Sequence, residues 1–575
     1  MTTKGSYQAV GANQSALFTL KLHRGDGMVL LAMNWRTGEP SADFVGFAIE
    51  YREPGGDRFF ALKNRLTFPG MDGAVLADKT STKLSPIQKF RWVHFPRNAD
   101  LPGDFTYRVS PVFMNDQNEL SYGEVQEAAI ELNRETYPGV LNVTYTRGFV
   151  SSQAFVDRYG KNSIAQLLPP KAAQGLDFVP THPKAAEALA WMGFEARGAL
   201  IELLDAALAD PKAKVYAICY DLNLPEVVSR FERLGQRLSV IIDESGEHAD
   251  PDSAESKAAA RLVQSARRAK RQKMGGLQHN KLIIVDGPKA RGAVVGSMNL
   301  SWRGLYVQNN NAIVLRHRRA VALAVKAFED FWANDGVDGF GATASASWQK
   351  LKLTKIDADI AFSPHLAHGA VLDAIAEDLR NTQSSLFFSL AFLSQTPGAI
   401  IEALRQIKKD DKVFSYGIAD KQVKTLADAS GIALTKPDGR VTVVYPQELA
   451  RNLPQPFKAE PSGGGGVRMH HKFLVIDFNL PTARVYMGSY NFSKAADFKN
   501  GENLLCIRDR RVATSYMVEA LRIFDHYHFR VVQAAAKSAG KPLQLKRPPR
   551  KPGEKPWWKE DFTARRKILD RKLFA

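Results

Sequence analysis

Hydrophobic and polar positions follow two different patterns along the chain. From about residue 15 to 135, short segments alternate apolar and polar residues and are separated by Gly, Pro and Asp, as in ALFTLKL and FTYRVSPVFM. This period-two alternation is typical of an antiparallel β-sandwich. From about residue 180, helical patterns alternate with buried β-branched runs, as in ALIELLDAALAD followed by KVYAICYDLN. Such alternation predicts βαβ units and a mostly parallel sheet.

The second pattern occurs twice, because its helix–strand series returns as HGAVLDAIAEDLRN, SLFFSLAFLS, GAIIEALRQIKK and KVFSYGIAD. We therefore predict a multidomain fold, in which an N-terminal β-sandwich precedes two duplicated α/β domains related by a pseudo-twofold axis. The predicted boundaries are 1–140 for the sandwich, 141–180 for a linker, 181–345 and 350–535 for the α/β domains, and 536–575 for a basic, Pro-rich C-terminal tail.

One stretch of the predicted sandwich carries a more specific pattern. LPGDFTYRVSPV, which follows the aromatic FRWVHFP, resembles the fibronectin type III pattern, in which a Tyr after a Leu-Pro-Gly turn forms a tyrosine corner. The resemblance implies that Tyr107 is this residue and that Trp92 is a core aromatic. An unrelated sandwich is the alternative. In either case we expect an accessory module that docks a partner.

Each α/β half carries the same polar motif. It reads QHNKLIIVDG and then GSMN in the first half, and MHHKFLVIDF and then GSYN in the second. His279 and Lys281 are two positions apart, as are His470 and Lys472, so each pair projects from one face of a strand. A turn and a second apolar strand follow, which predicts a hairpin that returns Ser and Asn to the side of His and Lys.

These residue types suit chemistry at phosphorus. Lysine binds a phosphate oxygen, and Ser and Asn add hydrogen-bond donors. Histidine attacks as a nucleophile or moves a proton near neutral pH. A displacement needs an attacking group on one side of the phosphorus and an acid on the other, and each motif supplies half of this. We therefore expect one active site between the halves of a single chain, with no metal ion and no cofactor.

The duplicated His-x-Lys-x4-Asp and Gly-Ser-x-Asn pattern, which extends over about 350 residues, resembles the phospholipase D superfamily. The resemblance implies a phosphodiesterase that acts through a phosphohistidine, with His279 as nucleophile and His470 as the acid for the leaving group, although the residues alone leave open which histidine attacks. It implies catalytic or phosphate-binding roles for Lys281, Lys472, Asp286, Asp477, Ser297, Asn299, Ser489 and Asn491. The two aspartates would orient an imidazole or hold the hairpin.

The two copies differ at one informative position. Glu502, in the NGEN run of the second half, stands where the first half has Asn310. In the superfamily a Glu at this position supports a histidine, so its presence in one half implies different roles for the two imidazoles. His471 is an additional histidine, and we expect a packing or solvent-facing side chain there.

The charge of the chain bears on the substrate. The formal net charge is +18 and the pI is near 9.6, which favours a polyanionic partner. Residues 256–273 carry seven Lys or Arg and are predicted to form a basic helix that enters the active-site region, with a solvated helix face as the alternative. In the tail, Trp557 and Trp558 could stack on bases, sit at a membrane interface or pack on the protein.

We therefore predict a nuclease that cleaves nucleic acid. The alternatives are a soluble phospholipase D or phosphatidyltransferase that acts on anionic phospholipid and, from another class, a non-catalytic partner-binding protein. Cys219 and Cys506 lie in apolar runs and are predicted to be buried free thiols. The start lacks a secretory signal and no run approaches the ~18 apolar residues of a membrane span, so we expect a cytoplasmic protein.

Overall fold

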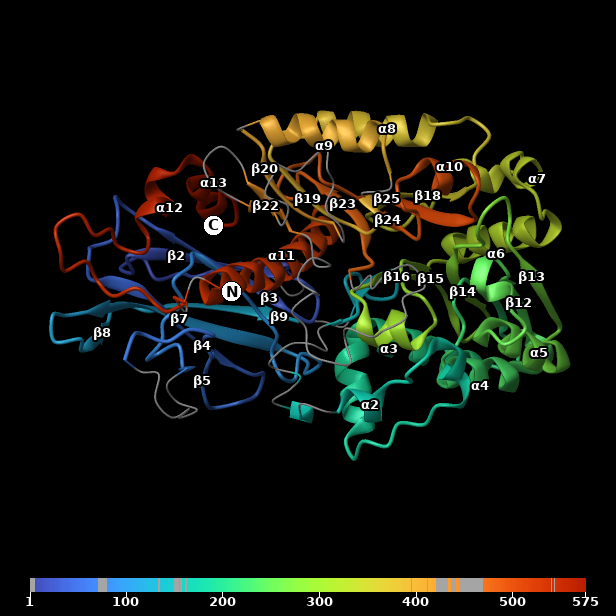
Figure 1. Cartoon of the computed structure of the whole chain (residues 1–575), viewed down its shortest axis with the longest axis horizontal. Coiled ribbons are helices and arrows are strands. Elements are labelled where there is room, and N and C mark those ends of the chain that lie inside the picture. The colour runs from blue at the N-terminus through green and yellow to red at the C-terminus, as the bar shows by residue number, and fades with distance from the viewer. Residues whose placement is uncertain are drawn as a thin grey trace. The chain divides into compact units, whose positions relative to one another are not determined.

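The structure is a computed structural model that describes residues 6–70, 80–132, 135–148, 155, 158–160, 163–393, 396–410, 412–419, 433–435, 441–444, 469–538, 540–541 and 543–575. Parts of the predicted linker 141–180 lie outside these residues. The chain divides into two compact units, which are Met1–Arg134 with Thr514–Ala575 and Glu135–Ala513 (Figure 1).

The first unit contains two antiparallel sheets. One has the strand order β1 (Gln8–Val10), β2 (Phe18–Arg24), β3 (Val29–Trp35) and β6 (Arg91–His94). The other has the order β5 (Phe60–Ala61), β4 (Phe44–Arg52), β7 (Asp104–Met114) and β8 (Leu120–Tyr122), and β9 (Gln126–Glu131) also pairs with β7. Alternate residues of both sheets, such as Leu31 and Phe47, share one hydrophobic core, as the period-two pattern predicts.

The two aromatics singled out in this region have different surroundings. Tyr107 is fully buried in β7, and its hydroxyl lies 3.0 Å from Nδ1 of His94. Burial lowers the pKa of His94 to about 3, so this ring is neutral. A tyrosine corner bonds to backbone instead, so this contact differs from the one that the fibronectin resemblance implies, and the resemblance stays a prediction. Trp92 is half-buried and packs against the core.

The C-terminal segment packs within the first unit. It contains α12 (Lys559–Thr563) and α13 (Arg565–Leu573). The Trp557 ring lies 5.6 Å from that of Phe44, and Trp558 is only 4% exposed. Both indole N–H groups donate to backbone carbonyls, so Trp558 is buried and Trp557 half-buried with their polar atoms satisfied. Of the three alternatives for Trp557 and Trp558, packing on the protein is therefore the one that the structure shows.

The first half of the second unit is built on a seven-stranded sheet. Its order is β10 (Leu141–Tyr145), β16 (Asn311–Leu315), β15 (Arg291–Gly296), β14 (Lys281–Asp286), β11 (Lys214–Cys219), β12 (Leu238–Asp243) and β13 (Arg268–Gln272). Only β11, β12 and β13 run parallel. The prediction of a mostly parallel sheet is wrong, because the motif hairpin β14–β15 and its neighbours β10 and β16 add antiparallel pairs. Strand β10 comes from the segment predicted as a linker.

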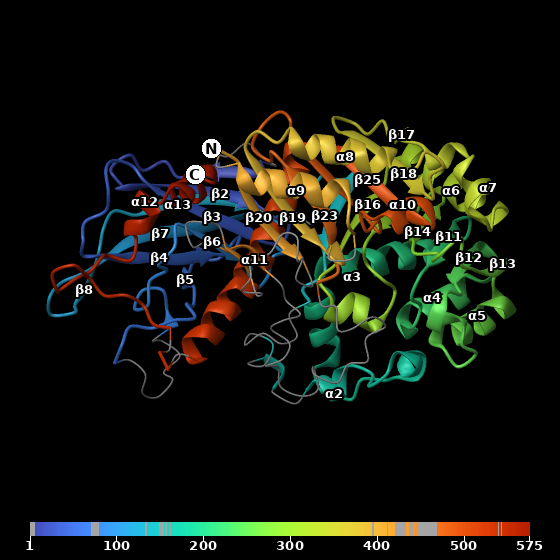
Figure 2. The same cartoon turned by 45° about the horizontal axis from the view of Figure 1, so that its top comes forward.

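Helices cover both faces of this sheet. The helices α3 (Ala185–Ala209), α4 (Pro225–Leu234) and α5 (Ala254–Ser265) share a core with one face, and Figure 2 shows α4 and α5 beside β12 and β13. On the other face α6 (Arg318–Ala333) packs its Phe328 against Tyr216 of β11. Short helices occur at α2 (Ile164–Leu167) and α7 (Val337–Gly341).

The second half is built on a nine-stranded sheet. Its order is β17 (Gln349–Lys350), β18 (Asp357–Ser363), β25 (Glu502–Arg508), β24 (Arg484–Gly488), β23 (Lys472–Ile476), β19 (Ser385–Leu390), β20 (Phe414–Ala419), β22 (Val441–Val444) and β21 (Ala433–Thr435). The order β25-β24-β23-β19-β20-β22 repeats β16-β15-β14-β11-β12-β13, so the duplication predicted from the sequence is present in the topology.

Helices also cover the sheet of the second half. The helices α8 (Ala370–Arg380) and α9 (Ala399–Lys409) cover one face of the nine-stranded sheet, as Figures 1 and 2 show. Helix α10 (Lys494–Phe498) belongs to the same half, whereas most of α11 (Arg510–Ser538) belongs to the first unit, which resumes at Thr514. In the part of the chain that the structure describes, no helix is long and apolar enough to cross a membrane. Cys219 and Cys506 are buried free thiols, as predicted.

The basic segment 256–273 is not one helix. Helix α5 ends at Ser265, and Arg268–Gln272 forms the edge strand β13. The guanidinium of Arg268 pairs with Glu329 and lies 4.4 Å from the ring centre of Trp332, and Lys270 pairs with Asp335 at 2.6 Å. Charged residues on an edge strand oppose pairing with other chains. The prediction of a basic helix that enters the active-site region is therefore wrong.

Candidate active site

The two hairpins place corresponding residues at corresponding positions. Lys281 and Lys472 are the first residues of β14 and β23, and the strands β15 and β24 end at Gly296 and Gly488. A Cβ at Gly296 would lie 2.3 Å from the Asn311 carbonyl oxygen, and a Cβ at Gly488 would lie 2.0 Å from the carbonyl oxygen of Asn503. Only glycine permits this close approach, which lets each Gly-Ser turn return to the histidine.

Backbone hydrogen bonds join each histidine segment to the opposite half. The His470 N–H donates to the Asn309 carbonyl at 3.0 Å, and the Gly501 N–H donates to the carbonyl of Leu277 at 2.9 Å. The two motifs, which are about 190 residues apart in the sequence, are thereby brought into one site within the second unit, as predicted.

Each imidazole is held through Nδ1 by a side chain from the opposite half. Nδ1 of His279 lies 2.7 Å from Oε2 of Glu502. Nδ1 of His470 lies 2.9 Å from Oδ1 of Asn310 and 3.2 Å from the carbonyl oxygen of Ser297. The Asn310 and Ser297 oxygens accept hydrogen bonds, so Nδ1 of His470 carries a proton. The Glu502 carboxyl accepts in its ionised form, and Nδ1 of His279 then carries a proton and leaves Nε2 for chemistry. One histidine thus faces a carboxylate and the other an amide.

The serines of both motifs hydrogen-bond the side chains that hold the imidazoles. The Ser297 hydroxyl donates to Oδ1 of Asn310 at 2.9 Å. Ser489 hydrogen-bonds the carboxyl group of Glu502 and accepts the Asn503 N–H at 2.9 Å. Both serines are fully buried. Each serine therefore fixes the residue that supports a histidine.

The two lysines are buried beside aromatic rings. Lys281 Nζ lies 4.4 Å from the ring centre of Tyr220 and donates to the His279 carbonyl. Lys472 Nζ lies 3.2 Å from Nε2 of His470 and 5.7 Å from the ring centre of Phe392. Burial lowers the pKa of Lys281 to about 7 and that of Lys472 well below its usual value. The site thus holds two amines whose charged forms a bound anion would stabilise.

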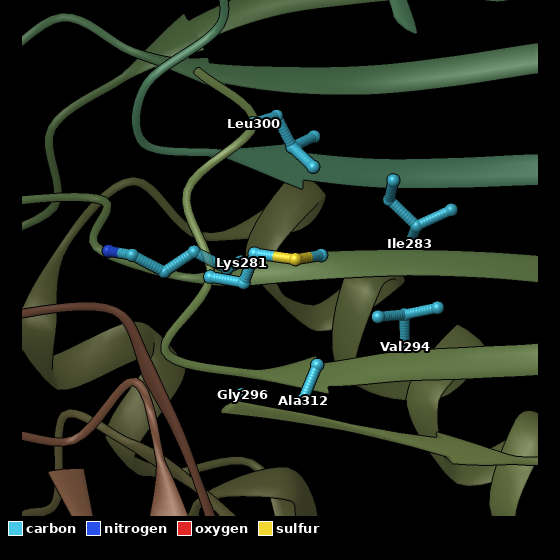
Figure 3. Close-up of a pocket in the computed structure, with 7 residues that line it drawn as sticks. Lys281, Ile283, Val294, Gly296, Leu300 and Ala312 are labelled. Carbon is cyan, nitrogen blue, oxygen red and sulfur yellow. The ribbon is translucent and has the colours of Figure 1, made fainter. Parts of the chain in front are cut away.

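An apolar cavity of about 10 Å³ lies beside the stem of Lys281 (Figure 3). The amine points away from Ile283 and Val294, which line the cavity. The stem therefore packs on apolar side chains while the charged end reaches the site.

Burial also shifts the pKa values of the acid–base groups. It lowers the pKa of His279 and that of His470 well below the usual histidine value, and the nearby lysines add to the effect. It raises the pKa of Glu502 to about 8, which Lys281 and Lys472 partly oppose. In the empty site the imidazoles are therefore neutral, which is the form that a nucleophile requires.

The two motif asparagines keep unused polar atoms. The amide oxygens of Asn299 and Asn491 are buried and have no hydrogen-bond partner among the described residues. Amide oxygen and nitrogen are assigned from their neighbours, so either end of each amide is available to a ligand.

The structure does not bring Asp286 and Asp477 to the imidazoles. Each lies five residues beyond its lysine, at the far end of the strand, which is about 17 Å away at the usual rise. Buried Asp477 accepts hydrogen bonds from the Ser384 N–H at 2.7 Å and the Thr482 hydroxyl at 2.9 Å, so it holds the hairpin. Asp286 is exposed, 3.7 Å from Arg291. Neither aspartate orients an imidazole.

Comparison with known proteins agrees with the duplicated motif. The family model described as "Cardiolipin synthase, PLD-like domain" matches residues 200–332 and 375–524, one match in each half. The chain belongs to the phospholipase D superfamily. Both superfamily motifs lie within the matched residues, on the hairpins β14–β15 and β23–β24.

The individual relatives match short segments. The chain is 43% identical over 60 residues to the uncharacterized protein L381 of Acanthamoeba polyphaga mimivirus, and 44% identical over 48 residues to a phospholipase D of Rickettsia felis. These matches cover 10% and 8% of this chain but only 21% and 22% of the relatives. The structure of phosphatidylserine synthase from Haemophilus influenzae is 13% identical, with a TM-score of 0.38 over 66% of this chain and 93% of that one.

The phospholipase D motif is flanked by His471, for which the sequence predicts a packing or solvent-facing role, and by a polar group that the sequence did not single out. His471 is buried, with its ring 5.2 Å from that of Phe473, as expected for a packing histidine. Asp221, His248 and Glu255 place ligand-type atoms within 4.8 Å of one another beside the first motif. The His248 ring already contacts Asp243 and Asp221, so the group forms an ion-paired network. One sequence feature could have pointed to this network: Asp243 stands at the carboxyl end of a parallel strand, where ligand-binding residues of α/β sheets lie.

Proposed function

We propose that the chain is a metal-independent phosphodiesterase that acts through a phosphohistidine. The observation that carries this proposal is the pair of imidazoles, each held through Nδ1 by a residue of the opposite half. His279 Nε2 has no partner among the described residues, and Glu502 in its ionised form holds the proton on Nδ1. This tautomer gives Nε2 the lone pair that attacks phosphorus. Because burial raises the pKa of Glu502 to about 8, the ionised form becomes dominant only as the pH rises past that value.

The reaction then proceeds in two displacements. Nε2 of His279 bonds to phosphorus, and the bond to the leaving oxygen breaks as His470 supplies its proton. A water, which gives a proton back to His470, next displaces Nε2 and releases the phosphate product. Glu502 stabilises the imidazolium that exists between the two steps.

Four side chains are proposed to hold the nonbridging oxygens. Lys281 and Lys472 supply charge, and Asn299 and Asn491 supply the amide groups that have unused atoms. The bound phosphodiester, being negative, offsets the repulsion by which Lys472 lowers the pKa of His470. Substrate binding therefore prepares His470 to carry the proton that it donates. Ser297 and Ser489 act by fixing Asn310 and Glu502.

For the substrate we propose nucleic acid, because a net charge of +18 favours a polyanion. Phospholipid is the second candidate, and it is favoured by the names of the Rickettsia relative, a phospholipase D, and of the matching family model. A cytoplasmic location and a docking role for the N-terminal sheets are part of the same proposal.

A paired substrate assay tests the function. The purified chain in excess EDTA is given DNA, RNA, phospholipid vesicles and bis(4-nitrophenyl) phosphate. The last is a phosphodiester that is part of neither a nucleic acid nor a lipid. Cleavage of the simple diester and of a nucleic acid is the expected result. Head-group release without cleavage of any nucleic acid would establish the lipid alternative, and turnover that requires a metal ion or fails on every diester would refute the proposal.

The lowered pKa of Lys281 predicts a pH dependence. Because burial lowers this pKa to about 7, the amine loses its charge as the pH rises above that value and then binds the phosphate group more weakly. Arginine keeps its charge, so the kcat/KM of the natural chain divided by that of Lys281→Arg should fall roughly tenfold per pH unit well above 7. The titration of Glu502 affects both proteins and cancels in this ratio. A ratio that stays flat up to about pH 9 would show that Lys281 keeps its charge.

A further inference from the structure

His248 stands at the centre of a charged network in the first half. Its Nδ1 lies 2.8 Å from Oδ2 of Asp243, which is fully buried, and its Nε2 lies 3.4 Å from Oδ1 of Asp221. Burial opposes the charged form of His248, but the hydrogen bonds to Asp221 and Asp243 outweigh it and raise its pKa to about 10. His248 is therefore a protonated imidazole at neutral pH, with a carboxylate on each nitrogen.

The network reaches His279 through the backbone. The second oxygen of Asp243, Oδ1, accepts the N–H of Gln278 at 2.7 Å. That N–H lies one residue before His279, and Gln278 is fully buried. A buried carboxylate that accepts this bond fixes the peptide from which the nucleophile projects.

The network also reaches His279 through an aromatic ring. The centroid of the Tyr220 ring lies 4.6 Å from that of His248 and 4.7 Å from that of His279, both in edge-on geometry. The Tyr220 N–H donates to the Asn280 carbonyl at 3.2 Å, which ties the ring to the motif strand. Tyr220 is thus packed between the two imidazoles and limits how far His279 can turn.

The turn that carries His248 is itself held firmly. The His248 carbonyl accepts from Arg271 at 2.6 Å, from the Ser253 hydroxyl at 2.9 Å and from the Ser256 hydroxyl at 3.2 Å. Arg271 lies in the basic segment 256–273, which was expected to contact a polyanion, but its guanidinium hydrogen-bonds this turn instead. Such support is what precise positioning of a side chain requires.

The second half is built differently at the corresponding place. Strand registers align Tyr220 and Asp221 with Ala391 and Phe392, because Cys219 pairs with Lys281 as Leu390 pairs with Lys472. The N–H of Ala391 donates to the His471 carbonyl as that of Tyr220 does to Asn280. Apolar residues therefore replace the Tyr-Asp pair beside His470.

We propose that the Asp243–His248–Asp221 network is a positioning device for His279, which fixes the Gln278 peptide and the Tyr220 ring against which the imidazole lies. The inference rests on the proposed function with His279 as nucleophile. In this proposal His248 affects only the first displacement, in which His279 attacks phosphorus. Loss of the network then slows formation of the phosphohistidine and leaves substrate binding unchanged.

Rapid-mixing kinetics with bis(4-nitrophenyl) phosphate test this role. In His248→Ala the rate of the first release of 4-nitrophenolate should fall roughly 10- to 100-fold. The Kd of the substrate, taken from the dependence of this rate on substrate concentration, should stay within about threefold. His248→Asn, whose amide can donate to Asp243 in place of Nδ1, should recover most of this rate. The control is His182→Asn in the same unit. The His182 ring contacts the Tyr159 carbonyl and the Lys184 N–H, not the motifs, so the first release should be unchanged.

Hydrogen exchange of the Gln278 amide gives a readout that needs no turnover. His248→Ala should speed this exchange, and His182→Asn should not. If the natural chain cleaves no diester, the proposed function fails and the exchange alone decides the positioning role. An unchanged first release, a change in the Kd of the substrate alone, or unchanged exchange would overturn the inference. If melting shows that His248→Ala is unfolded, Asp221→Asn, which keeps the shape and removes one carboxylate, takes its place under the same criteria.

Discussion

His279→Asn should abolish turnover, and His470→Asn should stop the enzyme at a covalent intermediate. Removal of a nucleophile costs roughly 10,000-fold or more in kcat, so His279→Asn should release no burst of 4-nitrophenolate from bis(4-nitrophenyl) phosphate. 4-Nitrophenolate leaves without a proton, so His470→Asn should still give a burst of one equivalent. It should then turn over slowly, because no base activates water.

Mass spectrometry of the trapped His470→Asn protein checks the assignment. The phosphoryl group should be found on the peptide that contains His279. His182→Asn is the matched control and should keep both phases, since its ring contacts neither motif. A phosphoryl group on the His470 peptide of a His279→Asn protein would reverse the two roles, and a burst in both variants would remove the phosphohistidine from the mechanism.

The sequence predicted the residues of the site better than their partners. His279, Lys281, His470 and Lys472 follow from strand alternation, which is local and places each pair on one face. The partner of His279 is Glu502, 223 residues away. The comparison of the two copies identified Glu502 as a supporting residue, but nothing in the sequence shows that it supports the histidine of the opposite half.

The aspartates show a second limit. Asp286 and Asp477 occupy the same motif position, yet one is exposed and the other is buried and caps a hairpin. The difference depends on which segment packs at the far end of each strand. The backbone N–H groups of residues 383–385 donate hydrogen bonds to the Asp477 carboxylate there. In a motif that spans a whole strand, the residues at one end can therefore take part in the reaction while the residue at the other end only stabilises the fold.

Charge and aromatic content were the least informative about function. Arg268 and Lys270 are paired with acids at the sheet edge, and Trp558 is in a core. Composition reports how many such residues exist, but tertiary packing decides which remain available to a ligand. The net charge therefore still favours a polyanion, while Arg268, Lys270 and Trp558, in the two segments expected to contact one, are paired or buried.

The unequal partners of the two imidazoles lead to the second prediction, which concerns Glu502→Gln. The amide has the same shape as the carboxylate, but its nitrogen can donate to Nδ1 of His279 and so move the ring proton to Nε2. That tautomer has no lone pair facing phosphorus, so the burst rate should fall roughly 1,000- to 10,000-fold with little change in the Kd of the substrate.

Asn310→Ala is the matched variant on the other side of the site. It removes one of two acceptors on Nδ1 of His470, and the Ser297 carbonyl remains at 3.2 Å. The expected loss is roughly tenfold and falls on the later hydrolysis, because only His470 loses support. If Asn310→Ala slowed the burst more than Glu502→Gln did, His470 would be the nucleophile, and the roles of the two imidazoles would have to be exchanged.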